Sequence, residues 1–312
     1  MNSTTRATSV APARHAAQAT AAPAGTPGKL LLGLIGAGIQ RSLTPALHEE
    51  EARHHGLRVH YQLIDLDRGA RGAEQLPELI DAARTIGFAG LNITYPCKQA
   101  VLPLLDDLSD EARAIGAVNT IVFDGARLVG HNTDATGWVH GFRRDLRDAD
   151  LSRVVLFGAG GAGAAIAHAA LHIGVGELVI VDCDAAKARS LEARLRMHAV
   201  RKPSRVRAET DVAHALAGAT GMIHATPTGM DKLPGLPLPE ELVQPTLWVS
   251  EIVYFPLETE LVKLARARGC AVSDGGGMAV GQAAGAFRLF TGREPDASRM
   301  DAHFRRLLLP PA

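Results

Sequence analysis

The feature that most constrains the fold is a glycine-rich turn, which follows an apolar run in Arg153-Val-Val-Leu-Phe-Gly-Ala-Gly-Gly-Ala-Gly163. The apolar residues predict a buried strand, and the small residues after Gly163 predict a helix. A second apolar run, 178–181, ends at Asp182, near the roughly 20 residues that separate glycines from acid in nucleotide-binding βαβ units. Strand, turn, helix, strand and terminal carboxylate together predict a parallel α/β sheet that binds a dinucleotide.

The residues around this turn also indicate which dinucleotide it holds. Glycines let the backbone approach a pyrophosphate, whose charge then lies at the N-terminus of the helix. Asp182 suits the free ribose hydroxyls of NAD and repels the 2′-phosphate of NADP, and no positive charge follows it before Lys187. We therefore expect NAD, and we expect Asp184 to cap the next helix. The expected cofactor-binding residues of this unit are Gly158, Ala159, Gly160, Gly161, Ala162 and Asp182.

A second glycine turn, Gly33-Leu-Ile-Gly-Ala-Gly38, also follows an apolar run, and a later run ends at Asp65. This turn lacks the third glycine, because Arg41 occupies that position. A side chain there obstructs the close packing of helix on strand that Gly163 permits in the other unit. We therefore predict that the N-terminal turn does not hold the cofactor.

Short apolar strands alternate with helical stretches from Leu30 onwards, which predicts parallel α/β layers. Asp124-Gly125, between the runs 118–123 and 127–130, predicts a hairpin. The other expected strands are 30–35, 58–64, 88–93, 153–157, 177–181, 221–225, 247–252 and 270–273, and the main expected helices are 45–55, 73–85, 134–146, 278–290 and 296–308.

This order predicts an α/β protein of two domains. We expect an N-terminal α/β substrate-binding catalytic domain at 29–133 and a Rossmann-type, doubly wound parallel-sheet NAD domain at 134–275. The C-terminal helices, 276–312, are expected to pack toward the catalytic domain. Residues 1–28, rich in Ala, Thr and Pro, predict a disordered tail. An organellar transit peptide is the alternative, weakened by the small number of arginines in this segment.

The composition excludes several classes of protein. Lys plus Arg and Asp plus Glu both number 33, so we expect no nucleic-acid partner. No apolar run approaches the roughly 20 residues that cross a membrane. The three cysteines are far apart in the sequence, which fits a cytoplasmic protein better than disulfides or a zinc site. His168 and His172 share a helix face, but Ala169 stands where a zinc protease needs Glu, so we expect no metal.

Four short polar clusters stand at predicted strand ends and turns, where sites form in parallel α/β sheets. They are Ser42-Leu-Thr44-Pro45, Asn92-Ile-Thr94-Tyr-Pro96-Cys-Lys98, Val118-Asn119-Thr120 and Asn132-Thr133-Asp134. Ser42 and Thr44 lie just before Pro45, which suits the first position of a helix, so their hydroxyls and the free N–H groups there suit a carboxylate. Thr44 is also a candidate helix cap, and both roles can hold at once. Lys98 is unfavourable at a helix start, which indicates that its charge serves a partner; a solvated lysine is the alternative.

Together with the glycine turn, these clusters resemble the shikimate/quinate dehydrogenase family. The resemblance runs from about Gly33 to Met300. It is carried by Gly33-Leu-Ile-Gly36, Ser42-Leu-Thr44-Pro45, Asn92-Ile-Thr94-Tyr-Pro96-Cys-Lys98, Gly116-Ala-Val-Asn119-Thr120, Gly130-His-Asn132-Thr133-Asp134, Gly158-Ala-Gly-Gly-Ala162 and Gln282-Ala-Ala-Gly-Ala-Phe287. Thr44 and Asp182 resemble the NAD-dependent quinate/shikimate branch in particular.

The resemblance implies an active site in the cleft between the two domains, with Lys98 and Asp134 as the catalytic pair. It implies that Ser42 and Thr44 hold the substrate carboxylate. The other substrate-binding residues it implies are Asn92, Thr94, Asn119, Tyr254 and Gln282, and Thr226 and Gly275 join the cofactor-binding set. The chemistry agrees, because oxidation of a secondary alcohol needs a base within reach of the hydroxyl while hydride moves to nicotinamide.

Three departures from the family pattern stand near the expected cofactor site. His224 replaces the family's Asn in Asn-Ala-Thr-Pro, Glu251 stands where Asp is usual, and Gly276-Gly277 lacks larger side chains. The catalytic pair is unaffected, although the sequence does not decide which of its members is the base. The expected activity is reversible, NAD-dependent oxidation of the C3 hydroxyl of quinate or shikimate, in the shikimate pathway or quinate catabolism, by a monomer or homodimer. The alternatives are a dehydrogenase of a related polyol such as aminoshikimate, and a nucleotide-binding sensor without turnover.

Overall fold

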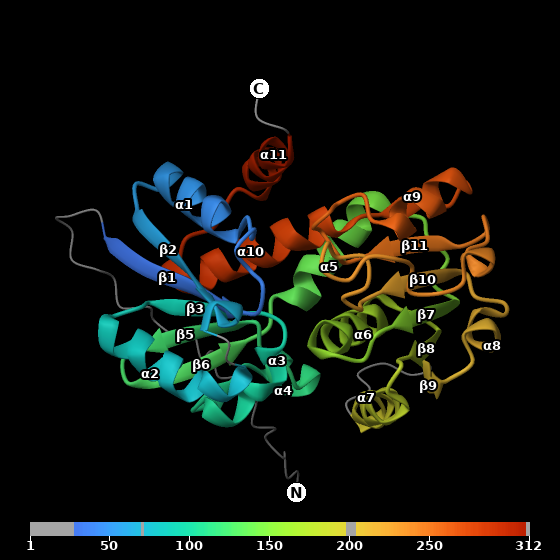
Figure 1. Cartoon of the computed structure of the whole chain (residues 1–312), viewed down its shortest axis with the longest axis horizontal. Helices are drawn as coiled ribbons and strands as arrows, with labels where there is room; N and C mark the ends of the chain where they lie inside the picture. Colours follow the sequence, from blue (N-terminus) through green and yellow to red (C-terminus); the bar gives the residue numbers. More distant parts are fainter. Residues whose placement is uncertain (1–27, 70–71, 198–203, 310–312) are drawn as a thin grey trace, which may run out of the picture.

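The computed structural model describes residues 28–69, 72–197 and 204–309. In this part of the chain two sheets lie side by side along the longest axis of the molecule, each with helices packed on its faces (Figure 1). We call the sheet of β1 to β6 with its helices the first lobe, and the sheet of β7 to β12 with its helices the second lobe. The tail expected at 1–28 lies, except for Gly28, outside the described residues.

The first lobe contains a mixed sheet of strand order β2-β1-β3-β5-β6-β4. Its strands are β1 (Lys29–Gly36), β2 (Arg58–Asp65), β3 (Gly90–Ile93), β4 (Asp107–Leu108), β5 (Thr120–Asp124) and β6 (Arg127–His131). β1 pairs in parallel with β2 and β3, as expected for these strands. β5 is antiparallel to both β3 and β6, so the predicted hairpin is confirmed; Gly125 has the positive φ of +60° that its turn requires.

The helices of the first lobe are α1 (Thr44–His54), α2 (Leu76–Ile86), α3 (Cys97–Ala100) and α4 (Asp110–Ile115). The helix predicted at 73–85 begins instead with a separate 3-10 turn, Ala73–Gln75, and ends at Gly87, where φ is +93°. β4 and α4 were not predicted, because elements of two to six residues are too short to display a hydrophobic period. The helix start expected at Lys98 is present as α3.

The second lobe contains a sheet in which every pair of neighbours is parallel, in the order β12-β11-β10-β7-β8-β9. The strands are β7 (Arg153–Phe157), β8 (Glu177–Val181), β9 (Arg205–Glu209), β10 (Gly221–His224), β11 (Trp248–Glu251) and β12 (Val272–Ser273). The helices α6 (Gly161–Ile173), α7 (Ala185–Met197), α8 (Val212–Leu216) and α9 (Glu260–Ala267) cover it. This is the doubly wound order of dinucleotide-binding folds, so the predicted fold class is confirmed. β9 was missed because charged residues alternate along this edge strand.

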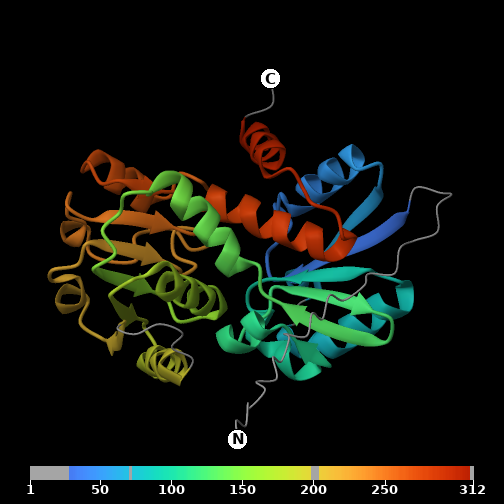
Figure 2. The same ribbon diagram turned by 180° about the vertical axis from the view of Figure 1, so that it is seen from behind.

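Two long helices join the lobes. α5 (Asp134–Asp145) leads from the first lobe to the second, and α10 (Gly275–Thr291) returns beside it (Figures 1 and 2). Glycines let them approach: a Cβ on Gly137 would lie 2.6 Å from the main-chain nitrogen of Gln282, and a Cβ on Gly281 would lie 2.8 Å from the Cα of Gly137. The last helix, α11 (Ala297–Leu308), lies near α1, as expected for C-terminal helices that return to the first lobe. The exact domain limits stay a prediction.

Among the residues that the structure describes, no helix is both long and apolar enough to cross a membrane.

Candidate active site

Lys98 and Asp134 meet where the two lobes join. Lys98 lies in α3 and Asp134 begins α5, and the Lys98 Nζ is 2.5 Å from the Asp134 Oδ2. The Lys98 side chain is 15% exposed and that of Asp134 is 4% exposed, so both side chains are largely shielded from solvent. Solvation of Lys98 alone, the alternative reading of the sequence, is therefore wrong. The two residues form a close, largely buried ion pair.

A network of amide and hydroxyl groups holds Asp134 from behind. Asn119, which is 2% exposed, donates through Nδ2 to Asp134 Oδ1 and to Thr133 Oγ1, both at 2.9 Å. Its Oδ1 accepts from the main-chain N–H of Thr133 and from Thr120 Oγ1. Both amide protons of Asn119 are therefore used within the protein, and its clearest effect in this structure is to orient the Asp134 carboxylate.

Ser42 and Thr44 lie together at the start of α1. Ser42 Oγ donates to Thr44 Oγ1 over 3.0 Å and accepts from the main-chain N–H of Thr44 over 3.3 Å. Thr44 is the first helical residue and Leu43 is the cap, so the prediction of Thr44 as a helix cap is wrong. Since α1 has no acidic residue in its first turn, the hydroxyls and free N–H groups there suit an anion.

Tyr254, from the second lobe, lies near Ser42 and Asp134. Burial raises the pKa of its hydroxyl and the nearby Asp134 charge adds to that rise, whereas a hydrogen bond with Ser42 opposes it. A phenol that stays protonated can donate to an anion or accept from a hydroxyl. Tyr254 therefore lies within reach of the residues that we expect to hold the substrate.

The remaining expected substrate residues fall into two groups. Thr94 and Gln282 are partly exposed, and Gln282 lies on α10, where its main-chain oxygen accepts from Thr133 Oγ1 over 3.0 Å. Asn92 is 4% exposed, and its Nδ2 donates to the Asn119 oxygen and to Thr120 Oγ1. Thr94 and Gln282 are thus partly open to solvent, whereas Asn92 is buried and both of its amide protons are used within the protein.

The structure adds two residues that the sequence analysis missed. Tyr61 donates its hydroxyl to Asn92 Oδ1 over 2.6 Å, and burial together with the charge of Tyr254 holds its pKa well above the ordinary value. Thr133 links Asn119 to α10. Thr133 stood in a polar cluster already noted, whereas Tyr61 gave no signal beyond an aromatic residue in a predicted strand.

The glycine turn of the second lobe has the geometry that a dinucleotide needs. Gly158 has a φ of +105°, and a Cβ on it would lie 2.6 Å from the oxygen of Ala225. A Cβ on Gly163 would lie 2.0 Å from the Gly158 oxygen, which confirms the close helix contact expected of the third glycine. Gly160 is exposed with open space beside its Cα, and α6 begins at Gly161 with free N–H groups. The open space beside Gly160 and the partial positive charge of these N–H groups can hold a pyrophosphate.

The other expected cofactor residues surround this turn. Asp182 follows β8, and its Oδ2 accepts from the main-chain N–H of Ala159 over 2.7 Å. Asp184 accepts from Ala186 and so caps α7, as predicted. Thr226 follows β10, and a Cβ on Gly158 would lie 3.1 Å from its methyl group. Gly275 begins α10, and a Cβ there would lie 2.4 Å from the Val253 oxygen.

The catalytic pair and the glycine turn are in contact. A Cβ on Gly161 would lie 2.9 Å from the Cβ of Lys98, so glycine at this position lets α3 approach the start of α6. A cavity of about 280 Å³ opens beside them, lined by Gln99 and Gly116 of the first lobe and by Ala159, Lys187 and Arg194 of the second. The site is therefore shared by both lobes.

The N-terminal glycine turn is arranged differently. Asp65 accepts from the main-chain N–H of Gly38 and from Gln40, so its carboxylate is used by its own loop. Arg41 points to the second lobe, where it pairs with Asp231 at 2.6 Å and lies 4.0 Å from the ring centre of Phe255. These contacts support the prediction that this turn serves another purpose than cofactor binding.

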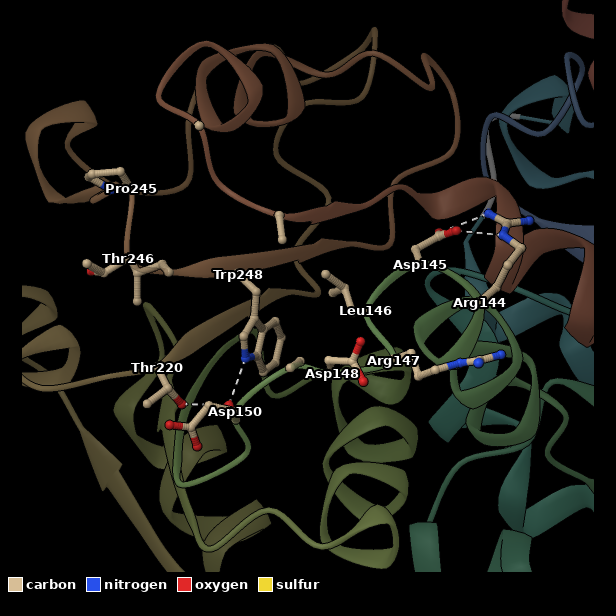
Figure 3. Close-up of a pocket in the computed structure, with 14 residues that line it drawn as sticks. Arg144, Asp145, Leu146, Arg147, Asp148, Asp150, Thr220, Pro245, Thr246 and Trp248 are labelled. Carbon is tan, nitrogen blue, oxygen red and sulfur yellow. Dashed lines mark hydrogen bonds and ion pairs between the residues drawn. The ribbon is translucent and has the colours of Figure 1, made fainter.

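A larger cavity of about 580 Å³ lies at the opposite edge of the second sheet (Figure 3). Thr220, Asp150 and Trp248 line it at the N-terminal ends of β10, β7 and β11, and the Trp248 Nε1 donates to the Asp150 oxygen over 2.8 Å. Doubly wound sheets bind ligands beyond the carboxyl ends of their strands. This cavity is therefore separate from the candidate active site.

Fold and site together define a two-lobed oxidoreductase that uses a pyridine nucleotide. The family model described as the shikimate dehydrogenase substrate binding domain matches residues 34–121, and that of the shikimate 5′-dehydrogenase C-terminal domain matches 275–303. The chain belongs to the shikimate dehydrogenase family, and it acts on a small molecule as a dehydrogenase of the shikimate/quinate type.

Three relatives illustrate the similarity. A shikimate dehydrogenase (NADP(+)) of Streptomyces avermitilis is 56% identical over 89% of this chain and 95% of its own. A quinate/shikimate dehydrogenase (NAD(+)) of Corynebacterium efficiens is 47% identical over 89% of this chain and 98% of its own. The structure of quinate dehydrogenase from Corynebacterium glutamicum in complex with NAD has a TM-score of 0.81 and 43% identity, covering 89% of this chain and 99% of that one.

Proposed function

We propose that the protein oxidises the C3 hydroxyl of quinate, of shikimate or of both to the 3-ketone, reversibly, with NAD. The observation that carries this proposal is the Lys98–Asp134 pair, 2.5 Å apart and in contact with the start of α6 through Gly161. A protein that only sensed a nucleotide would need no buried proton-transfer pair beside its cofactor turn.

The substrate carboxylate binds at the start of α1, to the hydroxyls of Ser42 and Thr44. We infer that the ring hydroxyls bind to Thr94, Tyr254 and Gln282, which are partly exposed, and to the amide of Asn92. A ring that carries a carboxylate at one end and a reacting hydroxyl at the other is thereby oriented by both lobes at once.

The Lys98–Asp134 pair takes up the proton of the reacting hydroxyl. Asn119 fixes Asp134, and Asp134 fixes the ammonium or amine of Lys98, so the pair acts as one coupled proton acceptor. The bound nicotinamide supplies the chemistry of hydride acceptance. In the reverse direction the pair returns the proton to the ketone oxygen as the hydroxyl forms again.

NAD is favoured over NADP by Asp182, whose carboxylate stands at the end of β8 beside the glycine turn. The named relatives include NADP(+) and NAD(+) enzymes, so relationship alone does not choose between them. Lys187, on the first turn of α7, and Arg194 line the cavity beside Ala159 and are the cations that a 2′-phosphate would use. The negative charge of Asp182 stands closer to the turn and opposes that use.

The test is a set of turnover assays of the purified protein. Quinate, shikimate and an unrelated linear 2-hydroxy acid are each offered with NAD and with NADP, and reduced cofactor is followed by its absorbance. We expect turnover of a cyclic polyol with NAD and none of the linear acid. Absence of turnover with every cyclic polyol would refute the substrate assignment.

Replacement of Asp182 tests the cofactor assignment. In Asp182→Ala the repulsion of a 2′-phosphate is lost while Lys187 remains, so the ratio of kcat/KM for NAD to that for NADP should fall by about tenfold or more, corresponding to roughly 1.4 kcal/mol. The matched control is Asp184→Ala, which removes only the cap of α7. An unaltered protein that prefers NADP would contradict the role of Asp182.

A further inference from the structure

Two buried ionisable side chains at the carboxyl edge of the second sheet have no part in the proposed proton transfer. His224 ends β10 and Glu251 ends β11, and the two residues are in register on neighbouring parallel strands. His224 is 0% exposed and Glu251 is 1% exposed. The His224 Nδ1 lies 2.9 and 3.0 Å from the two carboxylate oxygens. These are two of the three departures from the family pattern, and the structure brings them into contact.

The Glu251 carboxylate is held in place by further donors. Its Oε1 accepts from the main-chain N–H groups of Ile252 and Val253, at 2.8 and 2.9 Å, and its Oε2 accepts from Thr259 Oγ1 at 3.0 Å. Both carboxylate oxygens already accept from these donors, so the proton in the bond to His224 is assigned to Nδ1. The orientation of the imidazole is therefore fixed, and its Nε2 is the nitrogen directed toward Thr226.

Thr226 is the last member of this group of hydrogen-bonded side chains. The His224 Nε2 lies 2.5 Å from Thr226 Oγ1, and the main-chain N–H of Thr228 donates to the same oxygen over 3.2 Å. Thr226 is partly exposed, and its methyl group packs against the glycine turn at Gly158. A chain of hydrogen bonds thus runs from the buried Glu251 to a threonine at the edge of the cofactor site.

The position of β10 identifies the part of the cofactor concerned. A sheet of this order consists of two mononucleotide-binding halves, and the strand order reverses between β7 and β10. Asp182, at the end of β8, belongs to the half that receives the adenosine ribose. β10 and β11 belong to the other half, which faces the nicotinamide ribose, and Thr226 follows β10.

We propose that His224 and Glu251 are positioning residues that fix Thr226 as part of the binding surface for the nicotinamide-ribose half of the cofactor. This inference rests on the proposed use of a pyridine dinucleotide. The pair acts through Thr226, so its loss weakens the binding of that half and leaves the binding of the adenosine half intact.

The test measures binding of whole and truncated cofactors by calorimetry. The variants are Thr226→Val, which keeps the shape and loses the hydroxyl, His224→Asn and Glu251→Gln. The ligands are NAD, ADP-ribose, which lacks the nicotinamide ring, and ADP, which lacks the second ribose as well. We expect each variant to bind NAD about tenfold more weakly, the effect of about one lost hydrogen bond, and to bind ADP as the unaltered protein does.

The ADP-ribose result shows which group lies against Thr226. Weakened binding of ADP-ribose assigns the contact to the ribose, whereas unchanged binding assigns it to the nicotinamide ring; both outcomes support the proposal. Thr226→Ser restores the hydroxyl and should recover most of the affinity for NAD. The matched control is His54→Asn, which breaks an exposed histidine–glutamate pair on α1 and should leave every affinity unchanged.

Two outcomes overturn the inference. Unchanged NAD binding in the three variants would remove the pair from cofactor binding, and equal weakening of ADP and NAD would make its role purely structural. If the unaltered protein prefers NADP, the same series is run with NADP and 2′,5′-ADP. Binding of neither dinucleotide by the unaltered protein would refute the cofactor assignment itself. Failure to turn over a cyclic polyol, with binding intact, would refute the substrate assignment alone.

Discussion

At the scale of single residues, the environment of Lys98 decides its chemistry. The sequence offered a lysine at a helix start, which is equally typical of a solvated side chain, and only the folded chain brings Asp134 and Asn119 to it from positions after β6 and before β5. No helical or strand period encodes this contact, because it joins residues separated by 36 positions in the chain.

Replacement of Lys98 tests the proposed proton transfer. In Lys98→Ala we expect turnover to fall by about 10² to 10⁴, the usual contribution of a general acid–base group, while NAD still binds. Calorimetry and steady-state kinetics give the two measurements. Lys98→Arg, which keeps the charge beside Asp134 but does not release its proton, assigns the roles: turnover retained in this variant would make Asp134 the base.

His48 gives a residue-scale prediction about stability. It is fully buried on α1, both of its ring nitrogens lack a hydrogen-bond partner, and burial lowers its pKa from 6.5 to about 3. The unfolded chain therefore takes up a proton below pH 6.5 that the folded chain refuses until about pH 3. The protonation of His48 therefore costs no stability above about pH 6.5. Between pH 7 and pH 5 it should lower the free energy of unfolding by about 2 kcal/mol.

The comparison that checks this is urea unfolding of the unaltered protein and of His48→Leu at both pH values. Leucine has no proton to bind, and it fits among the rings of Tyr61, Phe287 and Phe290 that surround His48. The variant should lose less stability on acidification than the unaltered protein. Equal losses would show that the buried imidazole is not the acid-sensitive group.

At the scale of elements, the return of α11 to α1 depends on an ion pair between a buried Glu51 and a partly exposed Arg299. Glu51 is 1% exposed and accepts from Arg299 Nε and Nη2 at 2.9 and 2.6 Å, and from the main-chain N–H of Asp296 at 2.8 Å. Burial alone would raise the pKa of Glu51, but these hydrogen bonds outweigh it and lower the pKa. The carboxylate is therefore charged and fixes α11.

Glu51→Gln should destabilise the protein by about 1–3 kcal/mol, because an amide cannot accept all the hydrogen bonds that the buried carboxylate accepts. We also expect α11 to become the first site of cleavage in limited proteolysis. Thermal unfolding and mass spectrometry of the fragments measure both effects. Glu294→Gln, which breaks an exposed pair with Arg288, is the control and should cost less than about 1 kcal/mol. A normal cleavage pattern in Glu51→Gln would contradict the role of the pair.

At the scale of the whole molecule, the spacing of α5 and α10 sets how the lobes meet. Asp134 begins α5 and Gln282 lies on α10, so the glycine contacts between these helices also place two site residues. In Gly137→Ala the new Cβ would lie 2.6 Å from the main-chain nitrogen of Gln282, and the helices must separate. The expected cost is about 1–3 kcal/mol of stability and up to about 100-fold in kcat/KM.

Thermal unfolding, kinetics and small-angle scattering measure this effect. The control is Gly28→Ala, whose Cβ meets no atom within 4 Å and which should leave all three readouts unchanged. If Gly137→Ala is folded and its kinetics are unaltered, the spacing of α5 and α10 does not set the geometry of the active site.

The parts of this fold that depend on neighbours in the chain could be predicted from the sequence. β7 and β8 occupy the predicted residues, the third glycine packs as expected, and the hairpin forms at Asp124-Gly125, because strand period, glycine geometry and turn chemistry are local. The family resemblance named the candidate site for the same reason, since it rests on short motifs read in order.

The tertiary structure alone decided which of these parts meet. It placed Tyr61 on Asn92, joined His224 to Glu251 across neighbouring strands, and tied Glu51 to Arg299 over almost the whole length of the chain. The physical reason is that such pairs form between ends of separate elements, whose approach depends on the packing of both sheets and on the two helices between them. Composition and periodicity do not encode that packing.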